Sequence, residues 1–401
     1  MTRAAQAQIN LSALQHNLKR VREVSPQCRI MAVIKANGYG HGMERVARAL
    51  SSLDVDLDSC VATAGILPHA ACMDAQVSPH PCVVDAFGVA SIDEAITLRD
   101  AGITAPITLL EGFFEVAELI LIQQHNLDVV IHHPAQLAVL EGTLLATPIT
   151  VWLKVDSGMH RLGFAPEQVL DVWHRLVACC SVRKPVRLMT HLASADDLAS
   201  PQTSQQLACF NAATAEITAG RSRHPALSMH IERSIANSAA ILGWPQTHDD
   251  WVRPGIMLYG VSPFINDTAT AHNLKPVMTL TSQLIAINHY KQGDAIGYAA
   301  SWVCPHDMWV GVVAMGYGDG YPRHAVSGTP VLVNSKRVPL VGRVSMDMLS
   351  VDLSTQPQAR IGDAVTLWGE GLSVEEIARC ASTIPYQLLC GVTQRVKFVV
   401  V

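Results

Sequence analysis

The sequence lacks the features of a membrane or secreted protein. No continuous apolar run reaches the roughly 18 residues that a membrane-spanning helix needs. The N-terminal stretch MTRAAQAQINLSALQHNLKR has no uninterrupted apolar segment of the kind found in signal peptides, and instead shows an amphipathic helical pattern. Basic tracts are also missing, and the net charge is −5, so nucleic acid is not an expected partner. These absences indicate a cytoplasmic protein that binds no membrane.

Paired metal-binding motifs are also missing. The chain has 10 cysteines but no C-x-x-C pair, and without a signal peptide they are expected to be reduced thiols. One group could be considered as zinc ligands, but its spacing matches no common pattern. It consists of Cys60, Cys72, Cys82, His69 and His80. We therefore expect no metal site.

What is present is a regular alternation of apolar runs and helical patterns. SIDEAITLRDAG, for example, carries Ser91 and Glu94 at the spacing of a capping box and Gly102 where a helix can end. Eight such alternations favour a (β/α)₈ barrel, the fold of triosephosphate isomerase, over an open doubly wound sheet. The expected strands are Met31–Lys35, Val83–Val89, Ile107–Leu110, Leu127–Ile131, Ile149–Val155, Val186–His191, Leu227–Ile231 and Trp251–Tyr259.

The pattern changes after Pro263, where β-branched and alternating runs such as VMTLTSQLIAINHY follow one another. Only SVEEIARCAS predicts a clear helix there. We therefore expect a barrel domain at residues 1–265 and a C-terminal β-domain at residues 266–401. Residues 51–84 form an unusual insertion, far longer than the usual helix-to-strand connection of about 2 to 6 residues. It lies on the helix-to-strand side of the barrel, which predicts a surface excursion or an interface element.

Polar residues follow the predicted strands at the end where barrel enzymes have their active sites. Loops after the seventh and eighth strands commonly bind phosphate through backbone N–H groups, and a lysine facing such a site suggests a Schiff base with pyridoxal phosphate. Each residue alone also fits a structural role, such as a solvated lysine or a hydrogen-bonded histidine. Their shared position favours a site. In chain order they are Lys35, Tyr39, Lys154, Arg161, His191, Asn237, Ser238, Arg253 and Gly255.

Eight motifs resemble those of the alanine racemases, in the order of that family and across nearly the whole chain. The resemblance implies a barrel that binds pyridoxal phosphate, followed by a β-domain. It also implies interconversion of L- and D-alanine, which supplies D-alanine for peptidoglycan. The motifs are KANGYGHG, VDSGMHRLGF, THLASAD, ANSAA, VRPGIMLYG, MGYGDGYPR, VGRVSMDM and IPYQLLCGV.

Carried over to this chain, the resemblance implies that Lys35 holds pyridoxal phosphate and that His191 lies against its ring. Arg253 would face the pyridine nitrogen, and because a guanidinium is only a hydrogen-bond donor it disfavours a protonated ring nitrogen. The groups implied to hold the phosphate are Tyr39, Ser238, Tyr386 and the backbone of Gly255 and Ile256.

Racemisation needs two acid–base groups on opposite sides of the reacting carbon. The resemblance implies that these are Lys35 and Tyr317. In the family this tyrosine comes from the second subunit, which implies a homodimer with shared active sites. An unperturbed tyrosine has a pKa of about 10, so a base role at neutral pH needs nearby cations or a hydrogen-bond network.

The substrate carboxylate is implied to bind Arg161 and the backbone of Met346. Lys154 is at the position where the family often has a carbamylated lysine that orients this arginine. The alternative, an unmodified lysine held near Asp156, stays open.

Three alternatives to an alanine-specific enzyme remain. A broader racemase would accept serine or basic amino acids, and the sequence does not give the pocket volume that would decide this. A barrel-type decarboxylase would use a carboxylate at the pyridine nitrogen, where this chain has Arg253. A non-catalytic pyridoxal phosphate carrier would resemble the barrel alone, so the β-domain with Tyr317 argues against it.

Overall fold

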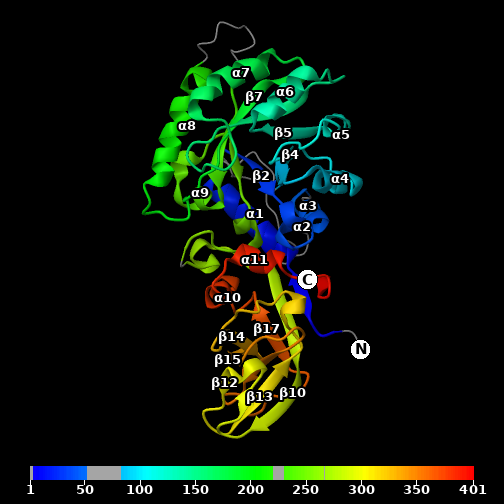
Figure 1. Ribbon diagram of the computed structural model, residues 1–401, viewed down its shortest axis with the longest axis vertical. Coiled ribbons are helices and arrows are strands. Elements are labelled where there is room, and N and C mark those ends of the chain that lie inside the picture. The colour runs from blue at the N-terminus through cyan, green and yellow to red at the C-terminus, as the bar shows by residue number, and fades with distance from the viewer. Residues whose placement is uncertain (1–2, 52–82, 220–229, 266) are drawn as a thin grey trace, which may run out of the picture.

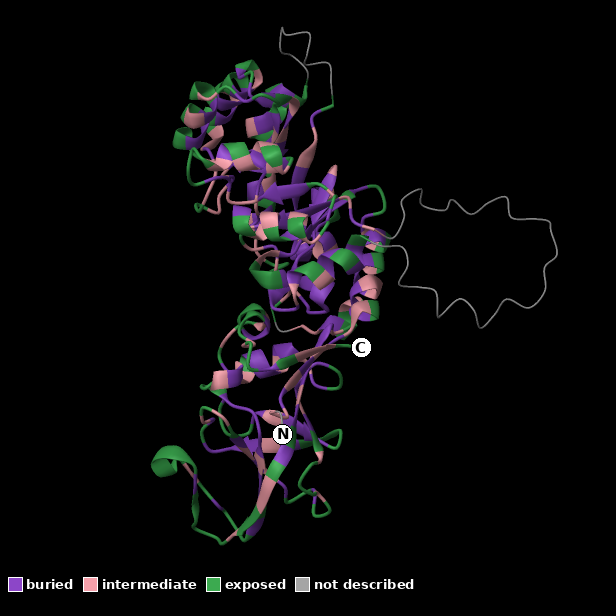
Figure 2. Cartoon of the chain, turned by 90° about the vertical axis from the view of Figure 1, so that its right-hand side faces the viewer, coloured by how far each residue is buried: buried purple, intermediate pink, exposed green. Residues whose placement is uncertain are grey.

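A computed structural model of the chain describes residues 3–51, 83–219, 230–265 and 267–401. A closed barrel and a β-sheet domain lie end to end along the long axis of the molecule (Figure 1). Buried residues follow the barrel strands, and many exposed residues lie on the surrounding helices (Figure 2). The predicted combination of a (β/α)₈ barrel and a C-terminal β-domain is confirmed.

Eight parallel strands form the barrel, which closes where the first pairs with the last. The strands are β2 (Arg29–Val33), β3 (Ala86–Val89), β4 (Ile107–Leu109), β5 (Leu127–Ile131), β6 (Ile149–Lys154), β7 (Val182–Met189), β8 (Arg233–Asn237) and β9 (Trp251–Arg253). The helices between and around them are α1 (Leu11–Val24), α2 (Lys35–Tyr39), α3 (Met43–Ser51), α4 (Ile92–Asp100), α5 (Glu118–Gln124), α6 (Pro134–Gly142), α7 (Val169–Ala178), α8 (Gln202–Thr218) and α9 (Ser238–Gly243).

The seventh predicted strand, Leu227–Ile231, is wrong. Residues 227–229 lie outside the described part of the chain, and the seventh barrel strand is β8. The sequence pattern missed β8 because the strand carries polar side chains that are paired inside the molecule. Ser234, for example, is buried, donates a hydrogen bond to the Trp251 carbonyl and accepts one from Arg253. The eighth strand also ends earlier than predicted, because Pro254 and Gly255 interrupt it and Ile256–Tyr259 form a short 3₁₀-helix.

The second sheet has the strand order β13-β16-β15-β14-β17-β10-β1-β18, with β10 also paired to β13. The predicted helix is confirmed as α10 (Val374–Cys380), and α11 (Pro385–Cys390), which was not predicted, follows it. The strands that follow the barrel are β10 (Met278–Tyr290), β13 (Met308–Val313), β14 (Pro330–Val333), β15 (Lys336–Val341), β16 (Leu349–Asp352), β17 (Ala364–Trp368) and β18 (Lys397–Val400). A separate hairpin joins β11 (Ala295–Ile296) to β12 (Trp302–Val303).

The chain begins in this second sheet, although the sequence assigned residues 1–265 to the barrel domain. β1 (Gln6–Ile9) is antiparallel to β10 and parallel to β18. Its Ala7 and Ile9 are buried and its two glutamines are partly exposed, as expected for a strand with one buried face. Four residues directly before a helix were too short a pattern to separate from that helix.

Most of the predicted insertion, with the cysteine and histidine group considered for zinc, lies outside the described residues. On either side, α3 ends at Ser51 and the Val84 N–H donates to the Leu50 carbonyl at 3.1 Å. Among the helices that the structure describes, none is both long and apolar enough to cross a membrane.

Candidate active site

A cavity of about 910 Å³ lies where the carboxyl ends of the barrel strands meet α10 and α11 of the second domain. Because parallel strands end at one face of the barrel, residues far apart in the sequence meet here. All eight residues predicted to bind the cofactor line it, together with the predicted Lys154 and Arg161. The eight are Lys35, Tyr39, His191, Ser238, Arg253, Gly255, Ile256 and Tyr386.

Lys35 stands two residues after the end of β2, at the start of an unusual backbone turn. Residues 36–39 all have left-handed φ values, between 51° and 63°, and only Gly38 among them is a glycine. A left-handed conformation costs about 1–2 kcal/mol for most other residues. The turn therefore depends on stabilising contacts. One of them is a hydrogen bond of 2.9 Å that the Met43 N–H donates to Asn37 Oδ1.

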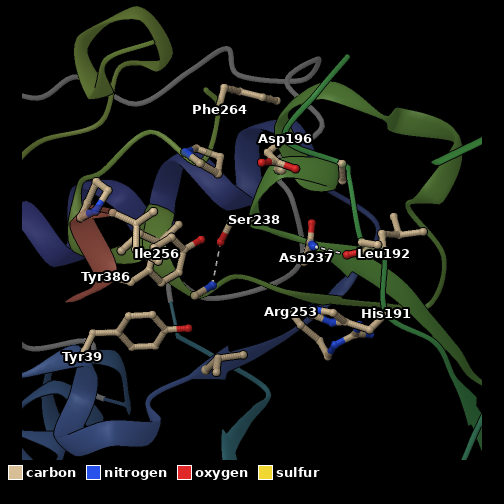
Figure 3. A pocket seen from close by; sticks show the side chains of 18 of the residues that line it. Tyr39, His191, Leu192, Asp196, Asn237, Ser238, Arg253, Ile256, Phe264 and Tyr386 are labelled. Carbon is tan, nitrogen blue, oxygen red and sulfur yellow. Dashed lines mark hydrogen bonds between the residues drawn. The ribbon is translucent and has the colours of Figure 1, made fainter. Parts of the chain in front are cut away.

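One part of the cavity presents hydroxyl groups, which can donate hydrogen bonds to an anion. Ser238, Tyr39 and Tyr386 surround it (Figure 3). The described hydrogen bonds include none from the hydroxyl group of either tyrosine. Burial raises the pKa of Tyr39 well above its usual value, and burial, with Asp196 nearby, raises the pKa of Tyr386 to about 12. Both phenols are therefore protonated donors at neutral pH.

Gly255 is required by the close approach of its neighbours. A Cβ atom at this position would lie 2.6 Å from the Tyr39 hydroxyl oxygen, well inside van der Waals contact. The Gly255 N–H donates to Ser238 Oγ at 2.8 Å (Figure 3). A side chain here would displace the Tyr39 hydroxyl from the cavity.

Arg253 and His191 form the wall at the other side of the cavity (Figure 3). Arg253 is buried and is fixed by donation to Ser234 Oγ and the Thr190 carbonyl, both at 2.6 Å. Burial lowers its pKa to about 10, so it remains a cation at neutral pH. Burial, and then Arg253, lower the pKa of His191 well below its usual value, which leaves the imidazole neutral.

Lys154 is buried among cations. Burial, followed by Arg253, Arg161 and Lys35, lowers the pKa of its amine to about 8. In the described part of the chain no ion pair joins this amine to Asp156. The Asp156 carboxylate instead accepts from the backbone N–H groups of residues 158–160 and contacts the His160 ring. The Asp156 carboxylate is thus held within its own loop.

Glu111 is a site residue that the sequence prediction missed. It lines the cavity, and its Oε1 lies 4.0 Å from the Lys35 amine. Glu111 comes directly after the predicted strand Ile107–Leu110, so the rule that found the other polar residues at strand ends would have found it too.

Tyr317 and Met346 do not line this cavity. Both lie in the second domain, with 38% and 52% of their surfaces exposed. Their loops contact each other: the Tyr317 N–H donates to the Ser345 carbonyl at 3.0 Å, and the Gly318 N–H to the Met346 carbonyl at 2.9 Å. The two residues thus form a pair on the surface of the chain, apart from the residues that meet in the cavity.

Comparisons with known proteins agree with this architecture. The alanine racemase N-terminal domain model matches residues 9–65 and 69–263, and the C-terminal domain model matches residues 277–400. The chain is 51% identical over 391 residues to the alanine racemase of Nitrosococcus oceani, with 98% of each chain covered. It is 48% identical over 390 residues to that of Shewanella baltica, with 97% of each covered.

Solved structures show the same similarity along the full chain. The biosynthetic alanine racemase from Pseudomonas aeruginosa matches with a TM-score of 0.86 and 42% identity, and the alanine racemase from Acinetobacter baumannii with 0.83 and 34%. Both matches cover 100% of each chain. From the two domain matches and these full-length similarities we conclude that the chain belongs to the alanine racemase family.

Proposed function

We propose that this protein interconverts L- and D-alanine with pyridoxal phosphate, as a cytoplasmic source of D-alanine for peptidoglycan. The observation that supports it best is the cavity, which gathers Lys35, an anion-binding group and a buried guanidinium at one end of the barrel. In this proposal the barrel formed by β2 to β9, without β1, holds the cofactor. The domain of residues 266–401 supplies Tyr386 and the surface pair Tyr317 and Met346.

The residues present fit pyridoxal phosphate. Two protonated phenols, the Ser238 hydroxyl and the backbone of Gly255 and Ile256 would hold its phosphate, at a position that the absence of a side chain on Gly255 keeps open. Lys35 would hold its aldehyde carbon, with His191 against the ring. Arg253 would face the ring nitrogen, where a donor-only group suits an unprotonated nitrogen. When bound, the cofactor withdraws electrons from the substrate Cα and makes its proton acidic.

The protein groups then bind the substrate and move one proton. Arg161 and the Met346 backbone would bind the substrate carboxylate, which fixes Cα between the two acid–base groups. The Lys35 amine would exchange the Cα proton on one side and the Tyr317 hydroxyl on the other. Removal on one side and return on the other inverts the configuration.

The same mechanism requires two chains. Tyr317 and Met346 are absent from the cavity lining of their own chain and stand exposed on the second domain. We therefore propose a homodimer in which each chain completes the active site of its partner.

A racemisation assay tests the proposed function. Purified protein is supplied with pyridoxal phosphate and either enantiomer of alanine, serine, lysine or arginine, and the products are separated by chiral chromatography. We expect alanine to reach an equal mixture from both sides, with the highest kcat/KM of the four. Faster turnover of serine or a basic amino acid would instead establish a broader racemase, and no turnover of any of them would refute the proposal.

Lys154 is expected to carry a carbamate. At pH 8 about half of its amine is neutral, because its pKa is about 8, and a neutral amine can attack carbon dioxide with release of one proton. The change from a cation to an anion replaces repulsion from Arg161, Arg253 and Lys35 with attraction.

Labelling with ¹³C-bicarbonate tests this modification. The protein should show one carbamate carbon signal by NMR at pH 8, and the signal should weaken as the pH falls and the amine becomes protonated. The Lys154→Arg variant should lack the signal, whereas a variant of an exposed lysine, Lys336→Arg, should keep it. A wild-type spectrum without the signal would favour the unmodified amine.

A further inference from the structure

Glu94 makes contacts that its sequence pattern does not predict. The first half of the expected capping box is present, since Ser91 Oγ accepts from the Glu94 N–H at 3.4 Å. The Glu94 carboxylate, however, accepts from the Ala90 N–H at 2.8 Å and from the Ala36 N–H at 2.7 Å. Ala36 is the residue directly after Lys35. Glu94 of α4 is therefore hydrogen-bonded to the turn that follows Lys35 in the neighbouring β/α unit.

The bond to Ala36 holds the first N–H group of the left-handed turn. Ala36 has φ 53° and ψ 50°, a conformation that is unfavourable for a residue with a Cβ atom. An ionised carboxylate has only acceptor oxygens, so Glu94 can serve both N–H groups at once. No uncharged side chain of the same shape can do this, because the amide of glutamine presents one acceptor and one donor.

The other end of the turn is held by His41. This residue is fully buried, and its Nδ1 lies 2.8 Å from the Tyr39 carbonyl oxygen and 3.1 Å from that of Gly38. Burial lowers its pKa to about 4, so the ring is neutral and Nδ1 carries the proton that these carbonyls accept. The turn is thus held at its first N–H by Glu94 and at its last carbonyls by His41.

We propose that Glu94 is a positioning residue for Lys35. It fixes the backbone of the turn that follows the lysine, and so sets the direction in which the Lys35 side chain enters the cavity. The kinetic part of this inference rests on the proposed racemase function. The structural part concerns the turn alone.

The structural part is tested by hydrogen–deuterium exchange on protein without cofactor. Glu94→Ala should speed amide exchange in the segment 35–40 by at least about tenfold, because the Ala36 N–H loses its acceptor, and Glu94→Gln should speed it less, because its amide oxygen can serve only one of the two N–H groups in the native geometry. Two controls should leave exchange in this segment unchanged: Ser91→Ala removes the helix cap, and Asp93→Asn removes an exposed charge from the same helical turn.

The kinetic part uses the holoenzyme and the same variants. Glu94→Gln should lower kcat for alanine by about 10- to 100-fold, since a small displacement of a reacting group has effects of this size. KM should change little, because Arg161 is untouched. Both controls should retain wild-type kcat.

The outcomes separate the two parts. Unchanged exchange at 35–40 in Glu94→Gln and Glu94→Ala would overturn the positioning role, whatever reaction the enzyme catalyses. Equal losses of kcat in Ser91→Ala and Glu94→Gln would also overturn the positioning role, because they would assign the effect to the capping of α4 at its N-terminal end. A wild-type protein that fails to racemise alanine would refute the proposed function, and exchange would still decide the role of Glu94 in the turn.

Discussion

Lys35→Ala should abolish racemisation, with kcat at least about 10³-fold lower, and should remove the near-visible absorbance of the lysine-bound cofactor. Both effects are expected because this amine has two proposed roles: it holds the cofactor, and it exchanges the Cα proton. Absorbance spectra of the purified protein and chiral assays measure the two losses separately.

The control for this experiment is the second lysine of the cavity. Burial lowers the pKa of the Lys154 amine to about 8, so without its proposed carbamate this amine would be partly neutral near pH 8 and could also attack an aldehyde. Lys154→Ala should retain the absorbance band even if turnover falls. A band that survives in Lys35→Ala and disappears in Lys154→Ala would show that the cofactor is attached to Lys154, which would contradict the assignment to Lys35.

Tyr317→Phe should slow exchange of the Cα proton of L-alanine by about 10²- to 10⁴-fold, the range typical of a lost acid–base group. Exchange from D-alanine, assigned to Lys35, should fall much less. Racemisation rates alone cannot show this difference, because the enantiomers have equal free energy and kcat/KM must fall equally in both directions. The measurement is therefore loss of the Cα proton to D₂O from each enantiomer, followed by NMR.

Mixed dimers test whether Tyr317 acts across subunits. Lys35→Ala and Tyr317→Phe chains, each nearly inactive alone, are dissociated together and allowed to reassociate. If the tyrosine comes from the partner, one site of each mixed dimer carries both substitutions and the other carries neither, so activity returns. If both residues serve the same chain, no intact site forms and activity stays absent.

The barrel could be predicted because each apolar run ends at polar or helix-forming residues, and seven of the eight predicted runs overlap the observed strands. The exception shows the limit of hydrophobic patterns. β8 carries Ser234 and Asn237, whose side chains bond to groups inside the molecule, so it looks polar in the sequence. β1 was not predicted for another reason. Its partners β10 and β18 are hundreds of residues away in the sequence, and no local pattern indicates such pairing.

The cavity residues that follow barrel strands could be located from strand ends, because the barrel geometry brings them together, whereas Tyr386 comes from α11 of the second domain and was named only by resemblance. The contacts that hold them could not be predicted from the sequence. Glu94 has the spacing of a capping residue, and only the fold shows that its carboxylate faces the turn after Lys35. Tyr317 and Met346 could be named only by resemblance, since they lie on another domain and no strand end leads to them.

The pairing of β1 with β18 has a consequence for how the protein is made. β1 leaves the ribosome before any of the barrel strands, and β18 leaves it after all of them. The barrel strands are all synthesised between them, so the barrel can close while one edge of β1 still awaits its partner. An unpaired strand edge is a template for association with other chains. A polypeptide interrupted after β10 but before residue 397 would therefore carry a formed barrel and an open β1 edge, which makes the second domain the part that such incomplete synthesis exposes to aggregation.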